Sequence, residues 1–355
     1  MNILFVMKHR ANAGNTHAVA NYIRVAPKFG HKVAMYGNPH PHLPELKFSR
    51  EFGKFDHIAY LFESEIYRLS PLQEAAMLGA IPKRDRLIFD MDGMYNPVIQ
   101  LDGYDFNHAS QAEQIRWKEY FEALSDRVMK PTLSAPQAPN VEAMPFYGYD
   151  PALEIYPANV PAKKYDILHI AHNWWRWRDI GGKLLPAIEP IRDQIGDIKF
   201  IGLWWDGPPA EGPEAGPEAA FQSDPAAFKR LRIQTGDSVL YTEIIRTMSM
   251  AKVNIFTQRP VLHHLKHLTL KYFEIFYADT IPLLMLEPDF AVEVYGPAAR
   301  ELVLDGDISG KLLDALARPD HYKSLVLQVR AHLAKHYPYE RRMAELVGAF
   351  EQARK

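Results

Sequence analysis

The fold is decided by the stretch NILFVMKHRANAGNTHAVANYIRVAPKFGHKVAMYG, residues 2–37. It starts with a continuous apolar run at 2–7, which is typical of a parallel strand buried on both faces. A polar turn containing glycine follows at 8–15, and the apolar residues of 16–30 then keep helical spacing until Gly30 supplies a stop. A second strand is predicted at 31–37. Strand, turn, helix and strand in this order open a doubly wound sheet, whose ligands bind at the carboxyl ends of the strands.

The same alternation runs through the rest of the chain. Further strands are predicted at 55–62 and 86–91, and a helix at 117–125 leads into 126–131. The proline-rich stretch 131–164 has little helical period and predicts a linker, and the Pro-, Gly-, Ala- and Glu-rich segment 206–228 predicts a surface loop. After the linker we expect strands at 165–173, 198–205, 253–258 and 281–286, and helices at 181–195, 238–250, 265–279, 308–316 and 322–336. The pattern predicts an α/β protein with two Rossmann-like domains.

Length and composition agree with two domains. The chain has 355 residues, whereas single cores usually stop growing at about 250 to 300 residues. Hydrophobic residues make up 47% and charged residues 24%, and the formal net charge of -2 gives no reason to expect a nucleic-acid partner. The absence of cysteine excludes disulfides, thiolate metal sites and a cysteine nucleophile. The chain shows neither a signal-like start nor a membrane-length apolar run, so we expect a cytoplasmic protein; the basic residues of IPKRDR, 81–86, leave a weak peripheral membrane contact open.

Two carboxylates, Asp90 and Asp92, follow an apolar run and precede Gly93. FDMDG is similar to the nucleophile signature of haloacid-dehalogenase-type phosphatases, with Asp90 as nucleophile and Asp92 as acid and base. That signature normally lies on the first strand of its domain, and GDIKFIG and GDSVLYTE lack the second aspartate of its later acidic pair. An Asp-x-Asp metal clamp for a nucleotide sugar also fits locally, but it leaves the second α/β half unexplained. A third interpretation places both carboxylates in a turn at the carboxyl end of a strand.

Five segments, in order, resemble the glycosyltransferases of the two-Rossmann GT-B type, and among them the bacterial group 1 or spore-maturation-type (CgeB-like) enzymes. The resemblance implies two domains that face each other across a cleft, an acceptor-binding domain at 1–150 and a nucleotide-sugar-binding domain at 151–335. It also implies a terminal helix at 336–355 that packs back toward the first domain. The segments are NILFVMKHRANAGN (2–15), AMPFYGYDP (143–151), KYDILHIAHNWWRWRD (164–179), LKYFEIFYADTIPLLML (270–286) and HYPYERRMAELVGAF (336–350).

The resemblance also implies roles for individual residues. A carboxylate can accept hydrogen bonds from both ribose hydroxyls of a nucleotide, and guanidinium groups pair well with phosphate oxygens. Asp92 is the candidate for general base or for a hydrogen bond to sugar or acceptor, while Asp90 is the candidate for orienting the loop. The implied donor-binding residues are Glu274 for the ribose, Lys271 one turn away, Arg176 and Arg178 for the diphosphate, Gly14 and Asn15 for the phosphate or sugar, and His172.

The expected reaction is a metal-independent transfer of a sugar from a nucleoside-diphosphate sugar to a carbohydrate or glycoconjugate acceptor. The chain departs from the resembling enzymes in two places. Lys266 and His267 occupy the neighbourhood of a second glutamate, and Asp279 stands where a glycine is usual. These departures keep a non-catalytic nucleotide-sugar-binding protein open. The histidines of HHLKH, 263–267, have helical metal spacing but no evident third ligand.

Overall fold

The computed structural model describes residues 1–62, 69–95, 100–101, 104–105, 111–134, 141–207 and 218–352. The chain divides into two compact units, which are described one at a time. Unit 1 comprises Met1–Tyr149, His264–Leu270 and Tyr337–Lys355, and unit 2 comprises Asp150–His263 and Lys271–His336. A short segment from the second half of the sequence is therefore part of unit 1.

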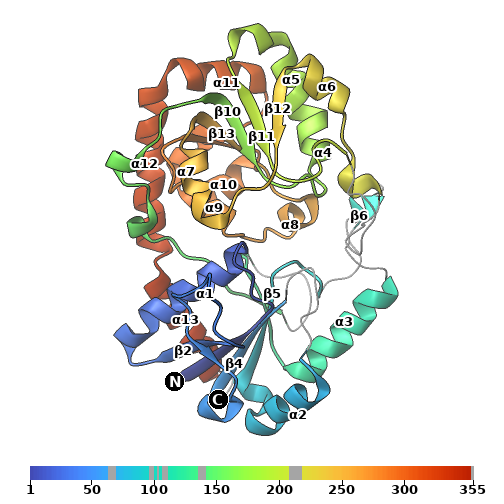
Figure 1. Ribbon diagram of the computed structural model, residues 1–355, viewed down its shortest axis with the longest axis vertical. Helices are drawn as coiled ribbons and strands as arrows, with labels where there is room; N and C mark the ends of the chain where they lie inside the picture. The colour runs from blue at the N-terminus through green and yellow to red at the C-terminus, as the bar shows by residue number, and fades with distance from the viewer. Residues whose placement is uncertain are drawn as a thin grey trace. The chain divides into compact units, whose positions relative to one another are not determined.

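Unit 1 is built on a parallel sheet with the strand order β3-β2-β1-β4-β5-β8-β9 (Figure 1). All residues of β4 are buried, as expected for a strand covered on both faces. The order runs outward in opposite directions from β1 and β4, so these two strands mark the switch point of a doubly wound sheet. The strands are β1 (Asn2–Val6), β2 (Lys32–Tyr36), β3 (Phe48–Ser49), β4 (His57–Phe62), β5 (Arg86–Asp90), β8 (Val128–Lys130) and β9 (Val141–Ala143); β6 (Gln100–Leu101) and β7 (Tyr104–Asp105) form a separate pair.

The helices of unit 1 include the chain's last helix, which packs against its first (Figure 1). The Tyr22 hydroxyl donates a 2.7 Å hydrogen bond to the Phe146 carbonyl, and the Tyr22 ring meets Tyr339 edge-on at 5.8 Å. The C-terminal helix thus returns to the N-terminal part of the chain, as predicted. The helices are α1 (Gly14–Val25), α2 (Pro71–Ala80), α3 (Gln111–Leu124) and α13 (Tyr339–Gln352).

Unit 2 repeats the architecture with a parallel sheet ordered β12-β11-β10-β13-β14. Its switch point lies between β10 and β13. The strands are β10 (Tyr165–Ile170), β11 (Ile198–Ile201), β12 (Ile233–Gly236), β13 (Ala251–Phe256) and β14 (Ile281–Leu284). The helices are α4 (Trp177–Asp179), α5 (Leu185–Ile188), α6 (Pro225–Arg230), α7 (Ile244–Met248), α8 (Pro260–His264), α9 (Lys271–Glu274), α10 (Pro288–Tyr295), α11 (Ile308–Ala317) and α12 (Pro319–His336). Over the residues that the structure describes, no helix combines the length and apolarity needed to cross a bilayer.

The helix predicted at 265–279 is wrong over most of its length, because only α9 is helical there. Lys266 has a left-handed backbone, with φ of 52°. His267 forms a β-bridge with Thr132, and the Leu268 amide donates to the Pro131 carbonyl at 2.6 Å. Backbone hydrogen bonds to residues far away in the sequence therefore outweigh the local helical period.

Three other predictions need correction. The helix predicted at 181–195 is broken into short helical pieces around α5, since its glycines and prolines do not sustain a regular helix. The predicted linker contains β9, which pairs with β8, although 135–140 lie outside the described residues. Strand β12 was not predicted, and α6 lies within the predicted loop 206–228, of which 208–217 are outside the described residues.

Candidate functional site

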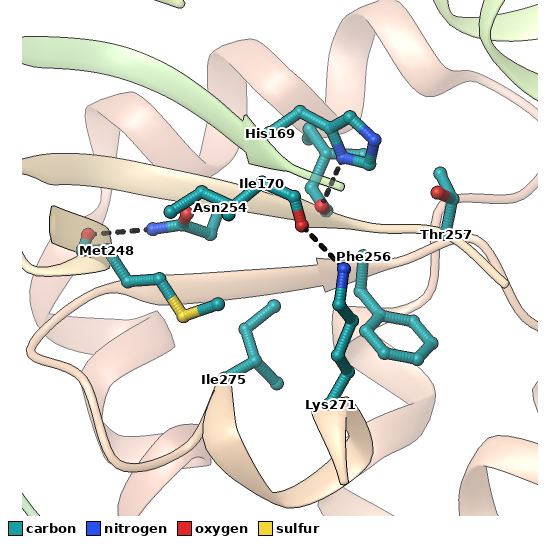
Figure 2. A pocket seen from close by; sticks show the side chains of 9 residues that line it. His169, Ile170, Met248, Asn254, Phe256, Thr257, Lys271 and Ile275 are labelled. Atoms are coloured by element: carbon teal, nitrogen blue, oxygen red, sulfur yellow. Dashed lines mark hydrogen bonds between the residues drawn. The ribbon is translucent and has the colours of Figure 1, made fainter. Parts of the chain in front are cut away.

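The carboxyl ends of β10 and β13, at the switch point of unit 2, border a narrow crevice with a cavity volume of about 10 Å³, which is room for about one water molecule. This is the place where doubly wound sheets bind ligands. Figure 2 shows two hydrogen bonds that hold its wall together: His169 Nδ1 meets the Ile255 carbonyl at 2.9 Å, and Lys271 Nζ donates to the Ile170 carbonyl at 3.0 Å. The lining residues are His169, Ile170, Met248, Asn254, Ile255, Phe256, Thr257, Lys271 and Ile275.

Lys271 begins α9 and extends its side chain toward the end of β10 (Figure 2). Its pKa is lowered to about 7, chiefly by burial and then by the positive charge of Arg176, while the carboxylate of Glu274 opposes the shift. The lysine is therefore a cation that the protein itself only partly stabilises.

Arg176 is a second cation of the site and is only 7% exposed. Its Nη1 donates to the carbonyls of His172 at 2.8 Å and Trp174 at 3.4 Å, and its buried Nε has no hydrogen-bond partner among the described residues. Burial lowers the pKa of Arg176 to about 9, and the charge of Arg259 acts in the same direction. Arg259 lies three residues after the end of β13, so three cations from three segments act on one another.

Glu274 lies one helical turn after Lys271 and is 4% exposed. Burial raises its pKa, while Lys271 and a hydrogen bond from the Tyr241 side chain lower it. A carboxylate held in this way can accept hydrogen bonds from hydroxyl groups.

The buried positive charges at this edge are poorly balanced. Asp179 favours the charged form of Arg176, but its carboxylate is also bound by Lys183 at 2.7 Å. The buried hydroxyl of Thr257, on the pocket wall, has no hydrogen-bond partner among the described residues. Desolvated like charges are costly unless an opposite charge is supplied. The arrangement suits an anion with several oxygens, next to a carboxylate that can bind hydroxyls.

The other two residues predicted on the β10–α4 segment lie differently. His172 accepts a 3.0 Å hydrogen bond from the Leu203 amide at Nδ1. Its residue surface is exposed, yet protein atoms crowd the ring, and this crowding with the charges of Lys271 and Arg176 lowers its pKa to about 4. Arg178 is exposed, and its charge acts on His263 rather than on the buried cations. The structure thus groups His172 with Arg176 and Lys271, and leaves Arg178 at the surface.

Gly14 and Asn15 belong to unit 1, where they begin α1. A Cβ atom on Gly14 would lie 3.0 Å from Leu270 Cδ2, so the glycine permits close packing of the 264–270 segment on the helix start. The Asn15 side-chain oxygen accepts a hydrogen bond from the Tyr147 hydroxyl. The N-cap residue Ala13 gives the helix no side-chain cap.

Asp90 ends β5 and is fully buried. Its two oxygens accept hydrogen bonds from the amides of Met94, at 2.8 Å, and Tyr95, at 2.9 Å. Burial raises its pKa, and the positive charge of the buried Lys130, on neighbouring strand β8, opposes the rise. Asp92 is half-buried on the loop that Asp90 holds. This geometry suits Asp90 for loop orientation and does not suit it as a phosphatase nucleophile, because its oxygens are enclosed.

Asp279, the residue at the usual glycine position, lies at the amino end of β14, away from the pocket edge. Lys163 Nζ binds its carboxylate at 2.8 Å, and its amide donates to Ser249 Oγ at 3.0 Å. This departure from the resembling enzymes therefore lies outside the residues that line the pocket. Among the residues that the structure describes, no three His, Asp or Glu side chains are grouped to hold a metal ion.

Two residues of the site were not predicted from the sequence. Arg259 directly follows the strand predicted at 253–258, and a cation at the carboxyl end of a predicted strand was a usable signal. Tyr241, whose side chain forms a hydrogen bond with Glu274, is far from α9 in the sequence. Nothing local marked it as part of the site.

No family model and no curated protein sequence matches the chain. Its structure is similar to an alpha-glucosyltransferase in complex with UDP, with a TM-score of 0.60 and 12% identity over 99% of both chains. For an alpha-glucosyltransferase in complex with UDP-glucose and DNA containing an abasic site, the TM-score is 0.61 and the sequence identity 11%, again over 99% of both chains. For T4 phage beta-glucosyltransferase with UDP and Mn2+, the TM-score is 0.51 and the sequence identity 13%, over 99% of both chains. These structures support the predicted fold, without supporting the finer spore-maturation type. The chain has the GT-B fold.

Proposed function

We propose that the protein is a glycosyltransferase whose unit 2 binds a nucleoside-diphosphate sugar. The observation that carries this proposal is a group of three cations at the switch point, the buried Arg176 and the half-buried Lys271 and Arg259, with Glu274 one helical turn after Lys271. A diphosphate would supply the missing negative charge. Glu274 would bind the ribose hydroxyls, as the resemblance implies.

The same groups would assist the chemistry. Negative charge develops on the diphosphate as the glycosidic bond breaks, and cations already in place stabilise it without reorganising. Asp92, on the loop after β5, would act as general base for the acceptor hydroxyl. Asp90 would hold that loop through its bonds to Met94 and Tyr95.

The structural neighbours support uridine nucleotides as the first donors to test, because their complexes contain UDP or UDP-glucose. The alpha-glucosyltransferase complexes also contain DNA, which opposes the prediction that nucleic acid is not a partner. The formal net charge of -2 favours a carbohydrate or glycoconjugate acceptor instead. Both acceptor classes belong in the assay.

Metal independence is part of the proposal, on the ground that the cations can take over the charge stabilisation a metal would provide. The neighbour with UDP and Mn2+ makes the metal a necessary variable. Nucleotide binding should therefore be measured with and without Mg²⁺ and Mn²⁺. A donor that binds only with metal would contradict this part of the proposal.

The test is nucleotide binding by calorimetry, with UDP, GDP, CDP and TDP. We expect one nucleotide to bind the wild type, and Lys271→Met and Glu274→Gln to weaken it. Lys252→Met is the matched control, because Lys252 is exposed at the amino end of β13 and pairs with Asp166 at 2.8 Å. Equal affinity in all variants would refute the assigned site.

Turnover separates an enzyme from a binding protein. Wild-type binding of a UDP sugar, with neither transfer to any acceptor nor slow hydrolysis, would favour the non-catalytic alternative. Loss of transfer in Asp92→Asn, with nucleotide affinity intact, would support the assigned base.

A further inference from the structure

Two tryptophans at the carboxyl edge of the unit 2 sheet have left-handed backbones. Trp175, after β10, has φ of 58°, and Trp204, after β11, has φ of 69°. A bulky residue in this region is strained, and the conformation persists only where its surroundings impose it. Such strain is concentrated at functional sites.

Specific contacts impose the conformation at Trp204. Asn173 Nδ2 donates to the carbonyls of Trp204 at 3.0 Å and Gln222 at 2.8 Å. The backbone amide of Leu203 donates a hydrogen bond to His172 Nδ1. Gly202 passes so close to the Ala171 carbonyl that a Cβ would lie 2.1 Å from its oxygen. The loop is therefore organised without a ligand.

The result is an aromatic platform, defined here as Trp174, Trp204, Phe221 and His172. Ring centroids lie 5.5 Å apart for Trp174 and Trp204, 5.2 Å for Trp174 and Phe221, and 5.0 Å for Trp204 and Phe221. His172 lies 5.5 Å from Trp204. Trp174 and Trp204 are only partly buried and His172 is exposed, so the platform offers ring surface to solvent.

The platform residues adjoin Arg176 through their backbone. Arg176 Nη1 donates to the backbone carbonyls of His172 and Trp174, two platform residues. Lys271 interacts with both Arg176 and Glu274, whereas the partners of Glu274 are Lys271 and Tyr241. The contacts therefore run from carboxylate through cations to aromatic rings. A nucleoside-diphosphate sugar has the same order: ribose, diphosphate, sugar.

We propose that the aromatic platform binds the sugar being transferred and selects it. This inference rests on the proposed function of the site. Trp204 and Trp174 would cover the apolar C–H face of the sugar ring, as aromatic rings cover apolar ligand surface in other sites. His172 Nδ1 accepts the Leu203 amide, so its proton is on Nε2, which would donate to a sugar hydroxyl.

The test compares UDP with UDP-glucose, which differ by the glucosyl group and by one negative charge on the terminal phosphate, so each variant is compared with the wild type by the ratio of the two affinities. Trp204→Asn removes the ring but keeps a side chain that tolerates left-handed backbone, and Trp204→Gly also relieves the strain. We expect both variants to bind UDP as the wild type does and to bind UDP-glucose about fivefold to tenfold more weakly. His172→Phe should show a smaller loss confined to UDP-glucose.

Trp177→Asn is the control, since Trp177 stacks on Phe228 outside the platform. It should leave the ratio of the two affinities unchanged. Equal weakening of UDP and UDP-glucose in the Trp204 variants would overturn the inference, because the rings would then serve the nucleotide or the loop. Unchanged UDP-glucose binding would also overturn it. If the wild type binds neither ligand, the proposed function fails first, and this inference fails with it.

Discussion

Lys271 Nζ donates a hydrogen bond to the Ile170 carbonyl at 3.0 Å, which ties the start of α9 to the carboxyl end of β10. Lys271 thereby places its charge beside Arg176, and both pKa values are lowered, chiefly by burial. Two cations held close together away from water destabilise the unliganded protein. The same arrangement favours the binding of an anion, which relieves their repulsion.

Lys271→Met should weaken UDP binding by about 10- to 100-fold, the range for losing a hydrogen bond to a charged group. The same change should also lower the free energy of unfolding, because it leaves the buried Glu274 without its neighbouring cation, although relief of the repulsion from Arg176 offsets part of that loss. Calorimetry and urea unfolding measure the two quantities. A large loss of stability with unchanged UDP affinity would make Lys271 a structural residue.

Binding of UDP should weaken as the pH rises above 7. The pKa of Lys271 is about 7 without ligand, and a diphosphate favours the charged form. Binding then takes up a proton, so affinity falls by up to about tenfold per pH unit until the pH passes the pKa of the complex. UDP itself is already ionised there, since phosphate groups have a second pKa of about 6.

Proton uptake can be measured by calorimetry at pH 8 in buffers of different ionisation enthalpy. Lys271→Arg is the control, because arginine stays charged throughout this range. A pH dependence that persists unchanged in Lys271→Arg would have to come from another group.

Acid should destabilise unit 2 through His169. Burial lowers the pKa of His169 from 6.5 to about 3, although the bond to Ile255 opposes the shift. Since the unfolded chain binds the proton first, stability falls as the pH drops from 6.5 toward 3, by at most about 1.4 kcal/mol per pH unit. His169→Phe should lose about 1 kcal/mol at pH 7 with the hydrogen bond, yet show a shallower decline below pH 6.5. Urea unfolding at pH 6.5 and at pH 4 measures the loss of stability in each protein. An equal loss in the wild type and in His169→Phe would contradict this assignment.

Gly14→Val should destabilise unit 1 by about 1 to 3 kcal/mol, the usual cost of overpacking. A Cβ there meets Leu270 Cδ2 at 3.0 Å, and a branched side chain needs more room. Leu270→Ala in the same protein should restore part of the loss, which a double-mutant cycle would show as coupling. Additive effects would mean that the two residues do not share this contact in solution.

Alanine substitutions at Asp90 and Asp92 should have different effects, the first on stability and the second on sugar transfer. Asp90→Ala removes two buried hydrogen bonds and leaves the buried Lys130 without its nearby carboxylate, so we expect a loss of about 3 to 5 kcal/mol. Asp92→Ala should change stability by less than about 1 kcal/mol and abolish transfer. Thermal or urea unfolding beside a transfer assay distinguishes them; a stable Asp90→Ala protein would refute the loop-holding role.

Local sequence was sufficient for the alternation of strands and helices. The runs at 2–7, 55–62 and 86–91 are mostly apolar, a pattern that suits strands buried on both faces. Prediction failed at 265–279, where helical spacing was present but α9 is the only helix. The hydrogen bonds that decide this segment come from Pro131 and Thr132, which no local pattern reveals.

The same division holds for the site. By itself, the sequence determined the α/β class, the two repeats and the placing of Lys271 one turn before Glu274, because these depend on periodicity along the chain. Only the tertiary structure decided that Arg259 and Tyr241 join them, that Asp90 is enclosed while Arg178 is exposed, and that Trp204 is strained beside His172. Burial, charge interaction and backbone strain depend on residues brought together from distant parts of the chain, so they exist only once the sheet has formed.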